Sequence, residues 1–544
     1  EKMDKTDYLN QQPYLDIIAK RVNAIKEGYR QNVAIIGDKD IGKTSIILHF
    51  LNHFNDPMIL PLYIELRPEY TKEYFVRKFI GVLLYNFLEN SIIARSENLD
   101  FLISKAAKFI PKTTKEITMI LNSLNRKQRG GSKNMENIFV QLLTLCDILN
   151  SETKKHCVIF FDEFHHLGTL GIKQIYKQFS KMLMIQKRVL YIISSSAKYR
   201  AKKILASHLA LLFGNFEIVE VEPFNLKTTE RFLSSRLNLS QIPKHLLDFL
   251  VHFIGGFPLY LNIIADALLK IPTPVTREKL AEVIQDLLFI ESGLLNQRFN
   301  NYLADLQKFK AAQDYKTLLY LIADGQNRIK DIATNLHKPK SQILARLNFL
   351  IESDLIDKSG DFFVINNRAF SFWLRFVYQE KLDSLTFNTD EQKKNFRIKI
   401  ENKISQFIAA NQKTVLERTM ELLNLFENAS MQMRTKKLRL VHFQEVKALN
   451  FMRGRLSEGL LGRAKRSLWI MAINPDILTE DDIADFSKQC RRLRYRKPQK
   501  KVIITHGDID TNVRLKAMEE KVLTWNLDDL NLVLDLYNKP RIIP

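Results

Sequence analysis

A chain of 544 residues with a formal net charge of +22 at pH 7 is too long for a single hydrophobic core and is strongly basic. Hydrophobic residues make up 46% and charged residues 26% of the chain, which excludes the intrinsically disordered class. The sequence contains no apolar run of the roughly 20 residues needed to span a bilayer and opens on polar residues unlike a secretory signal. Its three scattered cysteines fit no metal-binding spacing. We therefore expect a cytoplasmic, multidomain protein with reduced thiols.

The excess of positive charge favours contact with a polyanion, above all DNA. It is concentrated in three tracts, at residues 105–133, 436–466 and 491–501. Clustered charge is better evidence for a binding surface than an evenly spread excess. The alternative, that the tracts are solvated faces of a generally basic protein, stays open.

The first part of the chain alternates short apolar strands with helices. A helix is predicted at 14–30, a strand at Asn32–Gly37 and a second helix from Lys43 to about Phe54. Further strands are predicted at 58–66, 158–161, 189–194 and 217–222. Such strands are typical of a parallel sheet covered on both faces, so residues 1–225 predict an α/β domain. Residues 70–152 form a largely helical, basic insertion in which the Gly-Gly-Ser of 127–133 predicts a loop.

The rest of the chain changes pattern several times. Residues 226–305 are helical apart from an interruption at 255–258, and 306–378 predict three helices and a hairpin that turns at 358–361. Residues 379–415 predict a helical linker, with a charged segment at 389–397 of the kind that joins domains. An α/β pattern returns over 416–544. Its strands are predicted at 467–473 and 502–505, and its helices at Glu480–Arg492 and 512–519.

The loop after the first strand matches the phosphate-binding pattern G-x-x-x-x-G-K-[ST] at every fixed position. Its glycines let successive backbone N–H groups face the phosphates, and the helix that begins near Lys43 adds its positive end. Lys43 would reach the β- and γ-phosphates, and the Thr44 hydroxyl would bind Mg²⁺. We predict an ATP site made of Gly37, Asp38, Lys39, Asp40, Ile41, Gly42, Lys43, Thr44 and Ser45.

Two acids follow the apolar strand at 158–161, and ligands of open α/β sheets bind at that edge. Asp162 would hold Mg²⁺ together with Thr44, and Glu163 would polarise the attacking water. Glu163, Asp162 and Lys43 are therefore the predicted catalytic residues; the alternative is a buried strand that ends in ordinary surface acids. His165 and His166 have no third ligand at a suitable spacing, so we expect no metal site there.

Serines end the strand at 189–194. Ser194 is a candidate contact of the γ-phosphate or of the attacking water, and the alternative is a serine-rich turn. Both interpretations stay open.

Four elements follow one another along the chain: the phosphate loop, Asp162-Glu163, the serines, and the segment Gly-Gly-Phe-Pro-Leu-Tyr-Leu at 255–261. With these elements in this order, the chain resembles the archaeal-type P-loop ATPases of the STAND class. These are AAA+-related and similar to the origin-recognition ATPases. The resemblance covers most of residues 10–378. It implies an oligomeric ATPase in which 226–305 is a helical lid that brings Pro258 near the nucleotide. Asn215 stands where the family usually has an arginine that acts on a neighbouring subunit, which implies slow hydrolysis unless Arg200 or Arg231 substitutes.

Beyond the lid, residues 306–378 resemble a winged helix-turn-helix, which implies a recognition helix that starts near Lys340 and a closing aromatic segment at 370–376. In such a domain the recognition helix lies in the major groove of DNA. The implied DNA-binding residues are Lys338, Lys340, Ser341, Gln342 and Arg346.

The residues from 416 onward resemble a restriction-endonuclease-like domain. An active copy would carry Glu-x-Lys on its middle strand, because carboxylates and a lysine hold the metal and the water. Ala472 and Asn474 stand at these positions, so the resemblance implies an inactive domain kept for binding or assembly. The alternative is an unrelated small α/β domain.

Taken together, the sequence predicts a multidomain α/β protein with an AAA+-like P-loop domain, using ATP and Mg²⁺ as a DNA-associated regulator or assembly factor. The alternative is a nucleotide-switched STAND protein that oligomerises for signalling or interaction without binding DNA. A nuclease effector is argued against by Ala472 and Asn474. Self-association, and a protein partner at the C-terminal domain, are expected in either case.

Overall fold

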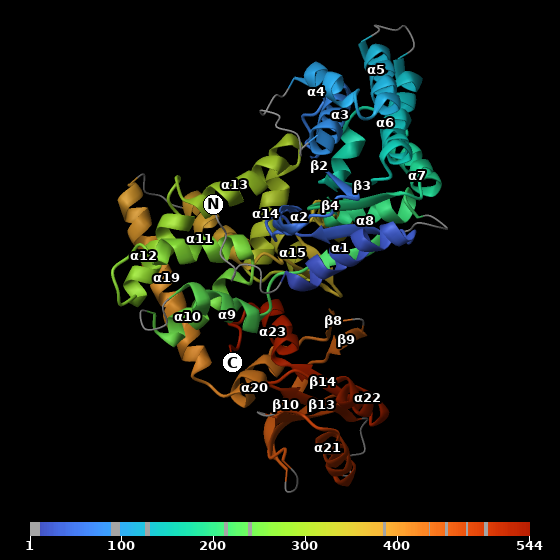
Figure 1. Ribbon diagram of the computed structural model, residues 1–544. Helices are drawn as coiled ribbons and strands as arrows, with labels where there is room; N and C mark the ends of the chain where they lie inside the picture. Colours follow the sequence, from blue (N-terminus) through green and yellow to red (C-terminus); the bar gives the residue numbers. More distant parts are fainter. Residues whose placement is uncertain are drawn as a thin grey trace. The chain divides into compact units, whose positions relative to one another are not determined.

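The computed structural model describes residues 11–88, 98–125, 131–210, 216–237, 242–383, 388–434, 436–451, 455–474, 477–493 and 499–543. The chain divides into two compact units, Glu1–Pro223 and Phe224–Pro544 (Figure 1). Within the described residues, no helix combines the length and the apolar character needed to cross a membrane.

The first unit is built on a parallel five-stranded sheet with the order β2-β3-β4-β1-β5. Each strand follows a short apolar stretch, and the central strands are buried along nearly their whole length because helices lie on both faces. The predicted α/β P-loop fold is therefore confirmed. The strands are β1 (Asn32–Gly37), β2 (Ile59–Glu65), β3 (His156–Asp162), β4 (Val189–Ser195) and β5 (Phe216–Val221).

Helices α3 to α6 fill the insertion between β2 and β3, next to the β2 edge of the sheet (Figure 1). Their apolar residues share one core with the sheet, as the ring contacts of Phe75 with Phe139 and Phe161 show. The insertion is thus an extension of the same core. The helices of this unit are α1 (Gln12–Ala24), α2 (Lys43–His53), α3 (Lys72–Leu88), α4 (Leu99–Ala106), α5 (Pro111–Asn125), α6 (Gly131–Thr153), α7 (Ile175–Ile185) and α8 (Lys198–Ser207).

One predicted loop is shorter than the sequence indicated. Gly131, Ser132 and Lys133 begin α6 rather than forming a loop, while the preceding residues 126–130 lie outside the described part of the chain. The reason is tertiary: from Met135 onward the helix buries an apolar face that includes Ile138 and Leu142, and this packing extends it through residues of low helix propensity.

The second unit begins with five helices, α9 (Leu226–Arg236), α10 (Lys244–Ile254), α11 (Pro258–Leu268), α12 (Arg277–Leu288) and α13 (Leu294–Ala304). The predicted interruption is a tight turn: Gly255 ends α10 with φ 76° and Gly256 follows with φ 84°. A side chain at Gly256 would collide with the backbone of Phe224. Pro258 opens α11, where the lost N–H has no helical partner.

Three helices and a two-stranded antiparallel hairpin follow, in the predicted order. They are α14 (Ala312–Ala323), α15 (Ile329–Leu336), α16 (Lys340–Glu352), β6 (Asp357–Ser359) and β7 (Phe362–Val364). The aromatic segment forms α17 (Arg368–Trp373), which continues through a π-helical turn, Leu374–Tyr378, into α18 (Gln379–Asp383).

The predicted linker is helical, but it is packed. Helix α19 (Thr389–Asn411) buries Phe396 and Phe407, which form ring contacts with Phe289 at the end of α12 and Phe249 of α10. The charged residues at its start, Asp390, Glu391 and Lys394, are exposed. The segment therefore belongs to the core of the second unit and is not a free connection between domains.

The remaining residues form a five-stranded mixed sheet with the order β10-β11-β12-β13-β14, together with a separate β8–β9 hairpin. Of these strands the sequence predicted only β12 and β13. Strands β8, β9 and β14 are five residues long, β10 has many exposed residues, and β11 contains two glycines, which are rare in strands. The elements are α20 (Val415–Leu423), β8 (Ala429–Met433), β9 (Lys436–Leu440), β10 (Phe443–Asn450), β11 (Glu458–Ala464), β12 (Leu468–Asn474), α21 (Glu480–Arg492), β13 (Gln499–Thr505), α22 (Thr511–Glu519), β14 (Val522–Asn526) and α23 (Leu527–Leu536).

Strand β12 is the middle strand of this sheet, and its side chains divide between two cores. Trp469 and Met471 pack on one face, while Ile470 and Ala472 pack on the other, where α21 and α22 lie. Ala472 is fully buried among apolar residues. Across the described residues, no three His, Cys, Asp or Glu side chains are grouped so as to hold a metal ion.

Candidate nucleotide-binding and hydrolysis site

The phosphate loop connects β1 to α2 at the carboxyl edge of the first sheet. Gly42 has φ 98°, a left-handed conformation that favours glycine, and it is the last residue before α2. At Gly37 a Cβ atom would lie 2.6 Å from the carbonyl oxygen of Val221 in β5. Both glycines are thus required by the curl of the loop and its close approach to the neighbouring strand.

Lys43 lies at the centre of this loop. Its side chain is buried, and Nζ donates hydrogen bonds to the carbonyl oxygens of Gly37 (3.1 Å) and Asp38 (2.8 Å). Burial lowers the pKa of Lys43, and the nearby carboxylates, Glu163 and Asp162 first, oppose that shift. Lys43 therefore holds a cation inside the curl of the loop, where a phosphate would meet it.

The other residues of the loop differ in their surroundings. Asp38 forms an ion pair with Lys198, the first residue of α8 (Lys Nζ to Asp Oδ1 2.7 Å). Lys39 is exposed, and Asp40 has a positive φ of 69°. Ile41 is buried, and Ser45 is half-buried in the first turn of α2.

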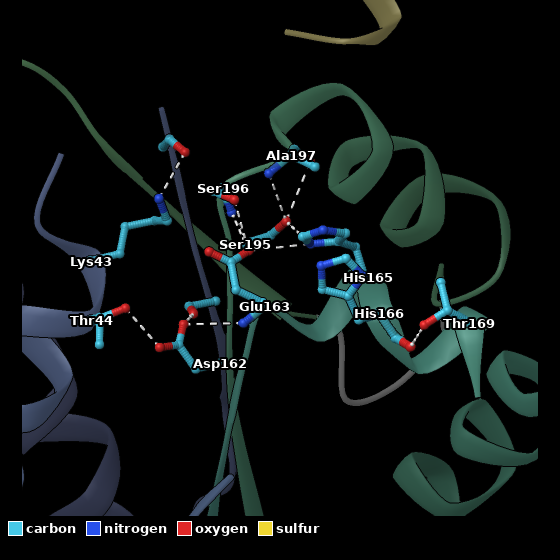
Figure 2. A network of polar contacts seen from close by, with 12 residues as sticks. Lys43, Thr44, Asp162, Glu163, His165, His166, Thr169, Ser195, Ser196 and Ala197 are labelled. Carbon is cyan, nitrogen blue, oxygen red and sulfur yellow. Dashed lines mark hydrogen bonds and ion pairs between the residues drawn. The ribbon is translucent and has the colours of Figure 1, made fainter. Parts of the chain in front are cut away.

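Asp162, at the end of β3, is the hub of a hydrogen-bond network (Figure 2). Its Oδ2 accepts hydrogen bonds from the hydroxyls of Thr44 (2.7 Å) and Tyr63 (2.9 Å). Its Oδ1 accepts one from the Ser194 hydroxyl. A hydroxyl and a carboxylate held this close are the donor set that Mg²⁺ takes in P-loop proteins, so the residues present fit this metal ion.

Glu163 follows in a left-handed conformation, with φ 54°. This turns its side chain toward the end of β4, where Oε2 accepts hydrogen bonds from the backbone N–H (2.8 Å) and the hydroxyl (2.9 Å) of Ser196 (Figure 2). Burial raises the pKa of Glu163, while the backbone hydrogen bond from Ser196 and the charge of Lys43 lower it. The carboxylate is thus oriented by β4 and made more basic by its surroundings.

His165 completes the network from the other side. Its Nδ1 lies 2.8 Å from the hydroxyl of Ser195 and 3.4 Å from Oε2 of Glu163. Burial, followed by the charges of neighbouring residues, lowers the pKa of His165 to about 3. It is therefore neutral near pH 7 and acts as a hydrogen-bonding partner, not as a cation.

Each of the three serines thus contacts a different residue at the end of β3 or just after it. Ser194 binds Asp162, Ser195 binds His165, and Ser196 binds Glu163. The sequence left open whether Ser194 contacts the phosphate or the attacking water, or belongs to a serine-rich turn. In the structure the three serines form a hydrogen-bond network that joins the ends of β3 and β4. Ser194 is fully buried and forms its hydrogen bond with Asp162, so its contact with the site runs through that carboxylate.

The structure gathers the predicted residues Gly37–Ser45, Asp162, Glu163 and Ser194 at one sheet edge. Pro258 lies in the second unit, so its contact with nucleotide stays a prediction, and Asn215 lies outside the described residues. Sequence reasoning missed Tyr63 and left Ser196 without a role. Their contacts depend on strand register, in which β2 and β4 flank β3, and no local motif marks them.

The residues predicted to bind DNA fall into two groups. Lys338 and Arg346 both form ion pairs with Asp314 of α14 (3.1 Å and 2.7 Å), which reduces their net charge toward a partner. The hydrogen bond from Lys338, and then the charge of Arg346, hold the pKa of Asp314 below its ordinary value. Lys340, Ser341 and Gln342 form the exposed first turn of α16.

The β6–β7 hairpin is docked on the C-terminal part of the same unit. The backbone N–H of Asp361 donates to the carbonyl of Ser430 in β8 (2.8 Å), and the Asp361 carboxylate accepts from the Ser430 N–H and hydroxyl. Phe362 is part of the hydrophobic core of the C-terminal sheet. The tip of the hairpin is therefore held against β8 by hydrogen bonds, although Asp361 itself stays exposed.

No family model and no curated protein matches the chain. Several solved structures are similar. A Walker-type ATPase of Pyrococcus abyssi has 20% identity and a TM-score of 0.44, over 69% of this chain and 97% of that one. The ORC2 protein of Aeropyrum pernix has 10% identity and a TM-score of 0.42, over 73% and 95%. A STAND protein with a tetratricopeptide repeat sensor from Pyrococcus horikoshii has 13% identity and a TM-score of 0.28, over 75% and 49%.

These descriptions name the classes of ATPase that the sequence motifs resemble. None of the TM-scores reaches 0.5, so the likenesses decide neither the fold nor the function. The parallel sheet, the curled glycine loop around Lys43 and the Thr44–Asp162 pair at its carboxyl edge identify the first unit as a P-loop fold.

Proposed function

We propose that the chain binds ATP with Mg²⁺ at the carboxyl edge of the first sheet and hydrolyses it. The observation that carries this proposal is the Asp162 hub, which brings the loop residue Thr44 to the strand acid and leaves Glu163 beside it. Thr44 and Asp162 would hold Mg²⁺, which supplies positive charge at the phosphates.

The remaining steps belong to this chain's own side chains. Lys43 and the N–H groups of the loop would bind the β- and γ-phosphates, because they are the cation and donors available there. Glu163 would orient the attacking water and accept its proton, held in place by Ser196. Ser194 and Tyr63 would keep Asp162 in its metal-binding position.

Nucleotide binding is tested with Lys43→Ala. We expect ATP affinity to fall at least about a hundredfold, because the substitution removes a charge-assisted contact to phosphate. Lys39→Ala, which changes the exposed lysine of the same loop, is the matched control and should bind ATP with nearly unchanged affinity. Equal affinity of Lys43→Ala and wild type in titration calorimetry would overturn the assignment of the site.

We further propose that the ATPase acts as a DNA-associated regulator or assembly factor, with the first turn of α16 as the DNA contact. The exposed Lys340, Ser341 and Gln342 and the net charge of +22 support this role. The docked hairpin and the pairing of Lys338 and Arg346 with Asp314 instead favour the alternative, in which this module serves packing and the protein works as a nucleotide-switched interaction protein.

Salt dependence separates these two roles. If Lys340 meets a phosphate, Lys340→Ala should reduce the slope of log affinity against log salt by about one unit for any duplex sequence. Lys308→Ala is the matched control, since Lys308 is an exposed lysine outside α16. No measurable binding of duplex DNA at low salt would leave the interaction protein as the function.

A further inference from the structure

The second unit contains a cavity of about 820 Å³ that has no part in the nucleotide site described above. It lies where α10, α17, α19, α20 and α23 meet the β6–β7 hairpin, and every residue that lines it belongs to this unit. Cavities of roughly 300–1,000 Å³ are the size of small-molecule sites. The side chains that line it indicate which class of ligand it would bind.

Six cations line the cavity, and three of them form ion pairs with two carboxylates. Arg375 pairs with Asp324 (2.9 Å). Asp535 pairs with Arg368 through Oδ1 and with Arg541 through Oδ2. The six are Arg368, Arg375, Lys403, Arg418, Lys539 and Arg541.

Of the other three cations, Lys539 is exposed, and Lys403 and Arg418 form hydrogen bonds with neutral groups. Lys403 Nζ donates to Oε1 of Gln406 (2.8 Å). Arg418 donates to the carbonyl oxygens of Ala410 (3.1 Å) and Pro540. Among the residues that the structure describes, neither forms an ion pair with a carboxylate. The acids of the lining are Asp324, Asp357, Glu421 and Asp535, so four acids stand against six cations and the lining carries an excess of positive charge.

This charge is held away from water. Arg418 is only 3% exposed, and Lys403 is half-buried. Burial lowers the pKa of both side chains, and the charge of Arg375 adds to that effect on Lys403, while the charges of Asp324 and Glu421 oppose it on Lys403 and Arg418 respectively. A buried cation without a carboxylate is costly, and an anion that enters the cavity would offset this cost.

Two half-buried aromatic rings lie next to these cations. Phe376 lies under both Arg375 (5.2 Å to the ring centroid) and Lys403 (5.4 Å), and its ring centroid is 4.5 Å from that of Phe372. Phe372 in turn contacts the ring of Phe253 edge to face. Cations beside an aromatic wall suit a ligand that has both an anionic group and a planar ring.

We propose that this cavity is a second ligand site, specific for a nucleoside phosphate, with the phosphates at Lys403 and Arg418 and the base along Phe372 and Phe376. The cavity is lined by the helical part, the hairpin and the C-terminal part of the unit. A ligand bound here stabilises their packing by mass action, independently of the phosphate loop.

The test counts bound ADP by calorimetry on the full chain. Wild type binds two equivalents, Lys403→Gln keeps only the equivalent at the phosphate loop, and Lys43→Ala keeps only the equivalent in the cavity. Lys394→Gln changes an exposed lysine of the same helix that does not line the cavity, so it keeps both. In the Lys43→Ala protein, Phe376→Leu weakens ADP about tenfold and leaves inorganic pyrophosphate unchanged.

Two results would overturn the proposal. One is a single equivalent of ADP in wild type that Lys403→Gln does not affect, since this places all binding at the phosphate loop. The other is equal affinity for ADP and pyrophosphate in the Lys43→Ala protein, because the aromatic wall then makes no contact with a base. If Lys43→Ala does not fold, the step from two equivalents to one in Lys403→Gln decides the question alone.

Discussion

Replacing Glu163 with Gln isolates the proposed general base from every other part of the site. The carboxylate oxygen that accepts hydrogen bonds from Ser196, at 2.8 Å and 2.9 Å, can be replaced by the amide oxygen of Gln with the same geometry. What disappears is the negative charge and the ability to take a proton. The variant should therefore fold and bind nucleotide but fail to hydrolyse it.

The size of each effect follows from these contacts. Loss of a general base lowers the turnover rate by about 10²–10⁴-fold. Hydrogen bonds from Ser196 to a neutral amide are about half as strong as those to a carboxylate, a loss of roughly 1 kcal/mol. Removal of a charge that burial already disfavours, as the raised pKa of Glu163 indicates, offsets that loss. The melting temperature should thus change by only a few degrees.

Single-turnover hydrolysis of labelled ATP measures the chemical step, and equilibrium titration measures affinity on the same protein. Glu65→Gln is the matched control, because this half-exposed carboxylate lies beside Asp162 in the sheet register and pairs with Arg67. Glu65→Gln should hydrolyse ATP at the wild-type rate. Turnover by Glu163→Gln within about threefold of wild type would refute the role of Glu163 as the base.

The raised pKa of Glu163 predicts that the turnover rate falls as the pH drops through a value above the ordinary 4.5, because protonation removes the base; a pH–rate profile measures this limb, and its absence would contradict the assignment. Asp314→Asn should release its two cationic partners and steepen the salt slope of DNA binding by up to about two units; an unchanged slope would show that they do not face DNA. Gly256→Ala adds a Cβ atom at a backbone φ of 84°, where it collides with the backbone of Phe224. We expect the free energy of unfolding, measured by urea denaturation, to fall by at least about 2 kcal/mol. A smaller loss would mean that the turn relaxes.

The phosphate loop was predictable because its chemistry is local. Eight consecutive residues place the glycines, Lys43 and Thr44, and the apolar strand before them and the helix after them follow from composition alone. The fully buried strands β3 and β4 are also legible, since strands covered on both faces must be apolar throughout. For the same reason Asp162 and Glu163 stand out at the end of β3.

The C-terminal sheet could be predicted only in part from the sequence. Strand β10 is an edge strand with many exposed residues, and its sequence lacks both the apolar run and the regular alternation that mark a strand. The charged start of α19 likewise suggested a linker, whereas its buried Phe396 and Phe407 pack it against other helices. These elements are stabilised by partners distant in the chain.

Only the tertiary structure decided which polar groups meet. The hydroxyl of Tyr63 reaches Asp162 from 99 residues away, and the hydroxyl of Ser196 reaches Glu163 from 33, because strand register brings them together. Asp314 forms ion pairs with two cations that the sequence assigned to DNA, and the cavity around Lys403 and Arg418 is formed by segments spread over almost 300 residues. A sequence motif fixes the chemistry of consecutive residues. The electrostatic environment of each side chain is set by the residues that the tertiary structure packs around it.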